Sequence, residues 1–223
     1  MFSLMAKNKI VLFANQKGGA GKSTLCTLLA HDMTNKQMPV VVADADLQQS
    51  LYQLRDQEAR AAGITEDDCP WDLMWIDCRD AAAVSRAVDM LKEVPATVLI
   101  DVPGNLSDDN LAPLYLAADL VVCPMNYQVF TINSTKRFAD VVRKINPKVR
   151  LVFVPNNIAS RKSFEEVQKE RSYGFELQKK FKGSWLTKEI GRFKCLERIS
   201  TLEYTKEQSE KLSEGFEGIY KWI

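Results

Sequence analysis

The segment that most constrains this chain runs from Lys9 to Ala30 and begins with the short apolar run Ile10 to Ala14. An apolar run of this length, rich in Val, Ile and Phe, is typical of a strand buried on both faces. The loop that follows carries three glycines, Gly18, Gly19 and Gly21. Because glycine adopts backbone angles closed to other residues, the peptide N–H groups of such a loop can converge on an anion. The sequence therefore predicts a strand that leads into a phosphate-binding loop.

A helix is expected directly after this loop. Leu25, Leu28 and Leu29 recur at helical spacing behind Ser23 and Thr24. The N-terminal end of such a helix has a positive partial charge that faces the loop and favours a bound phosphate. A lone glycine turn is usually an ordinary strand-to-helix connection, so the interpretation depends on the complete order of strand, loop and helix.

The strict phosphate-loop pattern G-x-x-x-x-G-K-[ST] requires a glycine where this chain has Gln16. The chain instead has KGGAGKS, from Lys17 to Ser23, with a lysine at each end of the loop. This segment resembles the deviant Walker A motif of the ParA/MinD family of ATPases.

The resemblance implies a role for each residue of the loop. Lys22 would hold the β- and γ-phosphates of ATP, Ser23 would ligate Mg²⁺, and Lys17 would reach the nucleotide of a partner subunit. The predicted nucleotide-binding residues are Lys17, Gly18, Gly19, Ala20, Gly21, Lys22, Ser23 and Thr24. Because no residue of the sequence clearly recognises the base, the choice of ATP over GTP depends on the resemblance alone.

A second apolar run, Val40 to Ala43, ends in the acidic residues Asp44 and Asp46. Ligands of open α/β sheets bind at the carboxyl ends of the strands, so these acids are expected beside the phosphate loop. The segment resembles the D-x-D-P-Q motif of the same family, with Leu47 in place of the usual proline. By that resemblance Asp46 would orient the attacking water, and Asp44 would organise the Mg²⁺ shell.

The apolar run Thr97 to Ile100 ends in Asp101, followed closely by Gly104. This is the Walker B position, where an aspartate binds Mg²⁺ through water. Further along, Asn156 and Asn157 follow the apolar run Leu151 to Val154. The family places residues that contact adenine there, but both asparagines are equally typical of a turn after a strand.

Strand and helix patterns alternate along the whole chain, which predicts a doubly wound, mostly parallel sheet with helices on both faces, as in P-loop ATPases of the deviant Walker A type. We interpret residues 1–223 as a single ATPase domain. Strands are also expected at Trp71–Ile76, at Leu120–Cys123 before Pro124, and at Trp185–Ile190. Helices are expected at Ala81–Leu91, from Ser107 to Ala118, at Phe138–Ile145 with Phe138, Val141, Val142 and Ile145 inward, and at Arg161–Lys180. Residues 53–62 are assigned to the charged surface.

The composition indicates the cellular compartment of the protein. No apolar run approaches the roughly 18 residues of a membrane span, and the N-terminus lacks the apolar stretch of a signal peptide. The five cysteines are an odd number without a C-x-x-C pair, so we expect reduced thiols and no metal site built on them. A cytoplasmic protein is predicted.

Charge is distributed unevenly despite a net value of +1. The segment from Lys179 to Arg198 is strongly basic and offers phosphate contacts for DNA. Its basic residues are Lys179, Lys180, Lys182, Lys188, Arg192, Lys194 and Arg198. ParA-type partition ATPases bind DNA without sequence preference as ATP-bound dimers and are stimulated by a centromere-binding, ParB-like adaptor. The resemblance therefore implies a homodimer, DNA and such an adaptor as partners, at the nucleoid.

Other functions remain open on the sequence. A MinD-like regulator would need a membrane-binding tail, but the amphipathic segment Glu207–Ile223 is slightly acidic and is expected to pack on the sheet. A ParA-like ATPase that positions a protein assembly has the same motifs. A metal-handling ATPase is disfavoured by the lack of closely paired cysteines, and a binding module without turnover by the acids Asp46 and Asp101.

Overall fold

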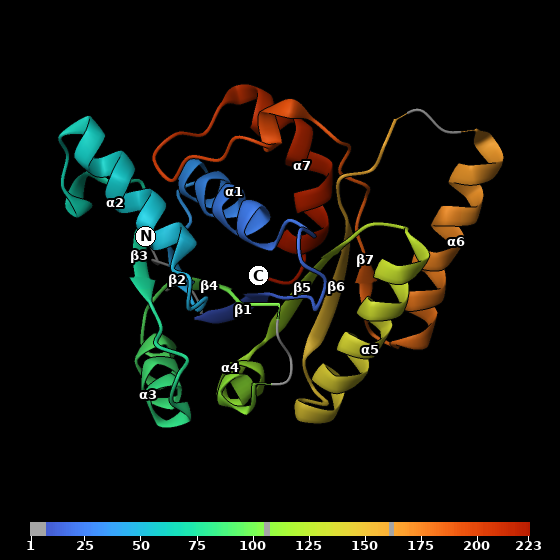
Figure 1. The fold of residues 1–223 in the computed structure, drawn as a ribbon, viewed down its shortest axis with the longest axis horizontal. Coiled ribbons are helices and arrows are strands. Elements are labelled where there is room, and N and C mark those ends of the chain that lie inside the picture. The colour runs from blue at the N-terminus through green and yellow to red at the C-terminus, as the bar shows by residue number, and fades with distance from the viewer. Residues whose placement is uncertain (1–7, 105–107, 161–162) are drawn as a thin grey trace, which may run out of the picture.

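The computed structural model describes residues 8–104, 108–160 and 163–223. Its core is a sheet of seven parallel strands in the order β3-β2-β4-β1-β5-β6-β7 (Figure 1). The strands are β1 (Lys9–Phe13), β2 (Val40–Asp44), β3 (Asp72–Trp75), β4 (Thr97–Asp101), β5 (Leu120–Met125), β6 (Arg150–Pro155) and β7 (Trp185–Leu186). The helices are α1 (Lys22–Asn35), α2 (Ser50–Ala62), α3 (Ala81–Lys92), α4 (Ala112–Ala117), α5 (Val129–Ile145), α6 (Phe164–Lys180) and α7 (Lys206–Tyr220), with short 3-10 turns at Glu66–Asp68, Asp109–Leu111 and Lys194–Leu196.

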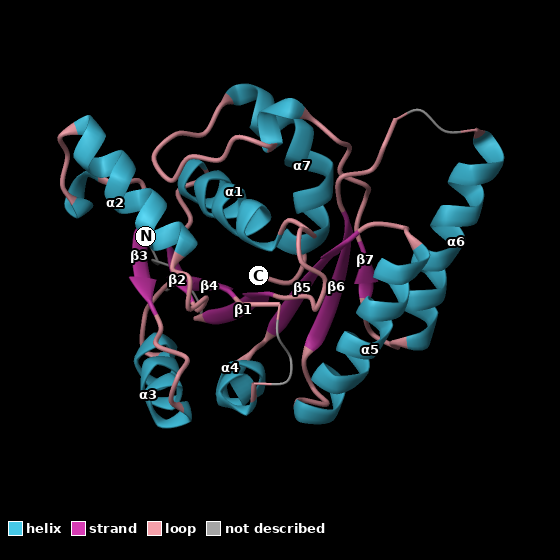
Figure 2. Cartoon of the chain, viewed as in Figure 1, coloured by secondary structure: helices cyan, strands magenta, loops and turns pink. Residues whose placement is uncertain are grey.

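Helices cover both faces of this sheet, which confirms the predicted doubly wound class (Figure 2). Successive side chains of a strand point to opposite faces, so Ile10 and Leu12 join one apolar cluster while Val11 and Phe13 join the other. Helices α3, α4, α5 and α6 complete the first cluster, and α1 and α7 complete the second. Strand β1 is therefore apolar throughout, and it holds the loop that follows it at the centre of the molecule.

The predicted end of β5 at Pro124 is wrong, because the strand continues to Met125. Proline has no N–H to donate to a neighbouring strand. On the side of Pro124, however, strand β1 has already ended, since its register with β5 stops at Val122. The carbonyl of Pro124 accepts there from the side chain of Asn15 at 2.9 Å. The missing donor therefore costs the sheet no hydrogen bond.

The surface position predicted for residues 53–62 is confirmed, whereas one side chain of α5 differs from its prediction. Residues 53–62 form most of helix α2, and Arg55 is the only one of them that is buried. In α5, Val141 was predicted to point inward but is 37% exposed, because Phe138 and Val142 occupy the buried face. The helix start predicted at Ser107 falls outside the described residues.

The C-terminal part of the chain packs along α1. Asp32 of α1 accepts a hydrogen bond from the Tyr220 hydroxyl at 2.6 Å, and the neighbouring His31 ring stacks on Tyr204 at 5.7 Å. Burial lowers the pKa of His31, which lies 3.0 Å from the carbonyl of Ser200. The apolar face of α7 is buried as predicted, through Leu212, Phe216 and Ile219.

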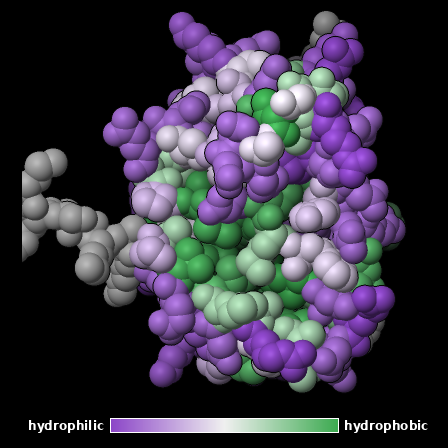
Figure 3. Space-filling view, turned by 90° about the vertical axis from the view of Figure 1, so that its left-hand side faces the viewer, coloured by the Kyte–Doolittle hydropathy of each residue, from purple (hydrophilic) through white to green (hydrophobic). Residues whose placement is uncertain are grey.

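The two outer strands are short. β3 lies at one edge, as predicted, and β7 at the other covers only two residues of the predicted Trp185–Ile190. Figure 3 shows the β3 side, where apolar side chains form a continuous area between hydrophilic ones. A groove of about 550 Å³ lies there between residues 38–41, 69–72 and 94–96. None of the helices in the described residues is long and apolar enough to span a bilayer.

Candidate nucleotide site

The loop between β1 and α1 leaves backbone N–H groups available to an anion. Gly19 and Gly21 adopt φ angles of 70° and 94°, which other residues rarely reach. Helix α1 begins at Lys22 without a side-chain cap and without an acidic residue in its first turn. The first N–H groups of a helix have no partner within it, and the helix dipole adds positive potential. The start of α1 is thus suited to bind phosphate.

The base of this loop is fixed by a residue that the sequence analysis did not single out. The buried side chain of Asn15 donates to the carbonyl of Pro124 and to the hydroxyl of Thr135, both at 2.9 Å. These contacts tie the entrance of the loop to β5 and α5. Only the tertiary structure brings these partners together, because they lie more than 100 residues apart.

The strand register places the predicted acids at one edge of the sheet. Asp101 at the end of β4 pairs in register with Phe13 of β1 on one side and with Asp44 of β2 on the other. The phosphate loop begins directly after β1. The acids of two separate strands therefore lie beside the loop, as predicted from their positions at the ends of the strands.

Asp101 is the most strongly perturbed acid of this edge. Its side chain is 4% exposed, and burial raises its pKa to about 7, against the effect of a hydrogen bond from Ser23 and the positive charge of Lys22. Its Oδ1 atom has no hydrogen-bond partner within the described structure. A buried carboxylate oxygen without a partner is expensive unless a cation approaches it. The site is therefore built to receive positive charge.

Lys22 points toward the same strand end. Its Nζ atom lies 3.6 Å from the position that a Cβ would take on Gly104, which places the ammonium group in contact distance of the segment after β4. The side chain of Lys22 is half-buried, whereas Lys17 and Gly18 are exposed. Within the described chain Lys17 forms no ion pair, so the two lysines of the loop have different surroundings.

The carboxylate of Asp44 is already engaged by the backbone. Its Oδ1 accepts from the N–H of Asp46 at 3.0 Å, and its Oδ2 accepts from Leu51 at 3.0 Å and Tyr52 at 3.3 Å. Burial raises the pKa of Asp44, while these hydrogen bonds lower it. Asp44 thus fixes the turn after β2 and the start of α2. Asp46 is half-buried in that turn and accepts from the N–H of Gln48 at 2.9 Å.

These residues suit Mg²⁺ in the company of a nucleotide. The Ser23 hydroxyl and the Oδ1 of Asp101 are oxygen ligands of the kind that Mg²⁺ takes, usually together with phosphate oxygens and water. No group of three or more His, Cys, Asp or Glu side chains in the described parts of the chain is arranged to hold a metal. The ion would accordingly bind with the phosphates rather than to the protein alone.

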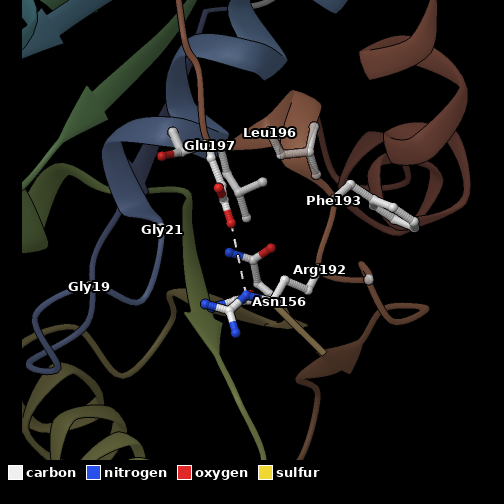
Figure 4. A pocket seen from close by; sticks show the side chains of 11 residues that line it. Gly19, Gly21, Asn156, Arg192, Phe193, Leu196 and Glu197 are labelled. Carbon is white, nitrogen blue, oxygen red and sulfur yellow. Dashed lines mark ion pairs between the residues drawn. The ribbon is translucent and has the colours of Figure 1, made fainter. Parts of the chain in front are cut away.

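A pocket of about 260 Å³ opens next to the loop (Figure 4). It is lined on one side by Gly19, Gly21 and Thr24 and on the other by Asn156 and Asn157. Asn156 donates to the carbonyl of Ala20 at 3.0 Å, and a Cβ at Gly21 would lie 2.3 Å from its Nδ2. Both asparagines therefore border the candidate nucleotide site, and Asn157 also serves the turn with a φ of 59°.

The far wall of the pocket was not predicted. It comes from the segment Gly191 to Glu197, in which Arg192 and Glu197 form an ion pair of 3.9 Å, drawn as a dashed line in Figure 4. The side chains of Phe193 and Leu196 complete this wall. In the sequence, Arg192 belongs to a basic stretch and Phe193 to an irregular segment, so nothing local indicates that they meet the loop.

Comparison with known proteins agrees with this geometry. The family model described as "CobQ/CobB/MinD/ParA nucleotide binding domain" matches residues 11–181. The chain belongs to this family. It is a ParA/MinD-type nucleotide-binding protein.

Two curated relatives each match about 70% of this chain. Protein IncC of Escherichia coli is 29% identical over 185 residues, which cover 69% of this chain and 51% of IncC. The chain thus spans about half the length of that relative. Maintenance of carboxysome distribution protein A of Halothiobacillus neapolitanus is 26% identical over 162 residues, covering 70% of this chain and 71% of the relative.

Among solved structures, a putative plasmid partition protein of Borrelia burgdorferi bound to AMPPNP superimposes with a TM-score of 0.73 at 20% identity. The match covers 97% of this chain and 100% of that structure. The shared fold is therefore that of the whole described sheet and its helices.

Replacement of Asp101 by Asn is expected to stabilise the nucleotide-free protein at pH 8 by roughly 1–3 kcal/mol, because a neutral amide avoids the cost of a buried charge. The pKa of Asp101 is about 7 in the folded protein, above the ordinary value of a carboxyl group. Deprotonation of Asp101 therefore destabilises the wild-type fold as the pH rises toward 7. Thermal unfolding measures the gain, and the added stability from Mg-nucleotide should disappear in the variant. Asp46→Asn, at a half-buried acid of the same edge, is the control; an equal gain there would contradict the argument.

Gly21→Ala is expected to weaken binding of a non-hydrolysable ATP analogue, because the new Cβ displaces Asn156 from the loop. Gly63→Ala is a matched control, since Gly63 also has a positive φ, of 68°, but no atom within 4 Å of its Cβ position. Both variants should lose about 1 kcal/mol of stability from backbone strain. Titration calorimetry should show lost affinity for Gly21→Ala alone; equal affinities would count against a role of this contact.

Proposed function

We propose that this chain is a Mg²⁺-dependent, ParA-type ATPase whose ATP-bound dimer binds DNA without sequence preference and partitions or positions it. The observation that carries the enzymatic part is the group formed by Lys22, Ser23 and the buried Asp101 at the uncapped start of α1. This arrangement concentrates a cation, a hydroxyl group and an acid where a phosphate can bind. Its acid has an oxygen free to face a metal ion.

Each residue of this group has a defined task in the proposed reaction. The N–H groups at the start of α1 and the ammonium group of Lys22 bind the β- and γ-phosphates and reduce the charge on the transferred group. Ser23 and Asp101 would hold Mg²⁺, which supplies further neutralisation of the phosphate oxygens. Asp46 orients the attacking water, and Asp44 keeps the loop around Asp46 in place through three backbone N–H groups.

Dimerisation is proposed to complete the site. Lys17 is exposed and forms no ion pair with the described residues of its own chain, although it stands at the head of the phosphate loop. Large apolar side chains are also exposed after β2 and β5, whose ends lie at this edge of the sheet: Leu47 at 50%, Val129 at 54% and Phe130 at 86%. A second copy facing this edge would cover these side chains and receive Lys17 at its nucleotide.

The function that we assign to this ATP-dependent dimerisation is DNA partition with a ParB-like adaptor, in the cytoplasm at the nucleoid. The support is the similarity to a solved plasmid partition protein and the excess of basic residues after residue 178. Binding through phosphate contacts would be independent of sequence and sensitive to salt.

Positioning of a protein assembly is the second candidate, because one relative is a protein for maintenance of carboxysome distribution. In that case the same ATPase cycle and DNA binding would serve a different cargo. A MinD-like attachment to membrane through α7 is disfavoured, since Leu212, Phe216 and Ile219 already bury its apolar face in the protein.

Lys17→Ala and Lys17→Gln are expected to reduce ATP-dependent dimerisation and to lower ATP hydrolysis by roughly tenfold or more, since a cation supplied in trans can contribute about 10³-fold to phosphoryl transfer. Size-exclusion chromatography with light scattering and a phosphate-release assay measure the two effects. Lys169→Gln, at another exposed lysine, is the control. Unchanged dimerisation and turnover in the Lys17 variants would refute the role in trans.

Duplex DNA of arbitrary sequence is expected to bind tightly with ATP, weakly with ADP and weakly without nucleotide. Because each phosphate contact releases counterions, the slope of log K against log salt should be about −0.9 per contact. A gel-shift assay in the three nucleotide states at two salt concentrations tests this. Binding that is equal in all three states, or that salt does not weaken, would argue for another output.

A further inference from the structure

The basic stretch predicted from Lys179 to Arg198 does not form one surface. Lys180 pairs with Asp140, Lys188 with Glu214 and Arg192 with Glu197. Gly191 to Glu197 lines the nucleotide pocket at the carboxyl edge of the sheet. Lys179 and Lys182, in contrast, lie at the end of α6 just before β7, which places them at the opposite, amino edge. The two ends of the stretch therefore face different parts of the molecule.

Basic residues from two other segments join Lys179 and Lys182 at the amino edge. The guanidinium group of Arg143, at the end of α5, donates to the carbonyl of Lys182 at 3.2 Å. The chain then continues through Lys144 and Lys148 to Arg150 at the start of β6. The lower ends of α5 and α6 in Figure 1 are the parts of the helices concerned.

Two tryptophans connect the chain terminus to this region. The Arg150 guanidinium lies 3.6 Å from the ring centre of Trp222, and the Lys221 ammonium lies 4.6 Å from that of Trp185. The two indole rings contact each other edge to face at 6.3 Å. We call the resulting set the amino-edge basic surface; it consists of Arg143, Lys144, Lys148, Arg150, Lys179, Lys182 and Lys221.

The charges of this surface lack partners within the described structure. None of its seven members forms an ion pair there, and three acids of the neighbouring segments are engaged elsewhere: Asp140 with Lys180, Asp119 with Lys9 and Glu176 with Lys136. Elsewhere most basic residues are paired, as Arg60 with Asp56 and Arg79 with Asp77 illustrate. Burial, and then the charge of Arg150, lower the pKa of Arg143. Cations that gather without ion-pair partners repel each other, and a polyanion would relieve this repulsion.

We propose that the amino-edge basic surface is the DNA-contacting surface of this protein and binds the phosphates of duplex DNA. The proposal rests on the DNA binding proposed above and locates it. Guanidinium and ammonium groups on three segments provide phosphate contacts of both the bidentate and the point-charge kind. Such contacts carry no base sequence information, as partition of arbitrary DNA requires.

The same surface is poorly suited to a membrane. None of the large apolar side chains that the structure exposes comes from residues 143–150, 179–185 or 221–223 of the described chain. Trp185 and Trp222 are half-buried, and the cations of Lys221 and Arg150 cover their rings. Membrane-surface binding normally combines basic residues with apolar side chains that insert among lipids. Two exposed apolar side chains lie beside the surface, namely Val141, two residues before Arg143, and Leu116, whose carbonyl accepts from Asn146. The excess of charge over apolar surface favours nucleic acid.

Its place on the sheet also limits how ATP can control it. The phosphate loop follows the carboxyl end of β1, whereas this surface precedes β6 and β7. The nucleotide therefore does not touch the residues that bind DNA. ATP acts by joining two copies, and two linked surfaces give a higher apparent affinity than one.

The double variant Lys148→Glu/Lys182→Glu tests the proposal, since both side chains are exposed and unpaired in the described structure. Its control is Lys169→Glu/Lys206→Glu, which makes the same charge change on α6 and at the start of α7. Fluorescence anisotropy with a labelled duplex and ATP is measured at several salt concentrations. The test variant should bind at least about tenfold more weakly, and its salt slope should fall by about 2. The control should bind like the unaltered chain, and all three proteins should form ATP-dependent dimers and hydrolyse ATP alike.

The possible results distinguish an error in the proposed surface from an error in the proposed DNA-binding function. DNA affinity that is unchanged in the test variant but lost in Lys194→Glu/Arg198→Glu would overturn the surface and place DNA at the nucleotide edge. Failure of the unaltered chain to bind duplex in any nucleotide state would overturn the DNA-binding function together with the surface. Sedimentation with vesicles rich in anionic lipid, combined with no binding to duplex, would identify a membrane as the polyanion and also overturn the proposal.

Discussion

The burial of a carboxyl group at the centre of the carboxyl edge is the constraint around which this structure is arranged. Asp101 loses its hydration in exchange for one hydrogen bond from Ser23 and the field of Lys22, and its Oδ1 is left without a partner in the described structure. Such a group costs folding free energy. Burial of the apolar side chains of the surrounding strands offsets this cost. A cation bound together with the phosphates of a nucleotide would compensate the negative charge of the carboxylate.

Asp44 is a second buried acid of this edge, and the cost of its burial is compensated in a different way. Asp44 is fully buried, but three backbone N–H groups at the turn and at the start of α2 satisfy its oxygens. Helix α2 is in turn held to the C-terminal segment, since Arg55 donates to the carbonyl of Thr201 and Glu58 accepts from the backbone N–H of Thr201. The segment just before Thr201 forms the far wall of the pocket. The phosphate end and the opposite wall of the candidate site are thus supported by one continuous set of contacts.

What the sequence predicted well was local. The strand, the glycine loop and the acids at strand ends are encoded by neighbouring residues, and the parallel topology then brings Asp44 and Asp101 into register. The far wall of the pocket could not be predicted, because Arg192 and Phe193 reach it through the path of the chain after β7 rather than through any motif. The prediction that β5 ends before Pro124 failed for a similar reason, because whether a proline ends a strand depends on the length of the neighbouring strand. Roles in hydrolysis, dimerisation and DNA binding remain predictions.

The two proposed functions, nucleotide binding and DNA binding, lie at opposite edges of the sheet. At the carboxyl edge, charges are buried and partly compensated, which suits a single nucleotide bound in fixed geometry. At the amino edge, Arg143 and its neighbours are unpaired in the described structure and mostly exposed, which suits an extended polyanion that offers many equivalent phosphates. No residue belongs to both surfaces, so the bound nucleotide would not touch the proposed DNA contacts. On this proposal, association of two copies through the exposed apolar side chains beside the phosphate loop, with Lys17, is the link between hydrolysis and DNA binding.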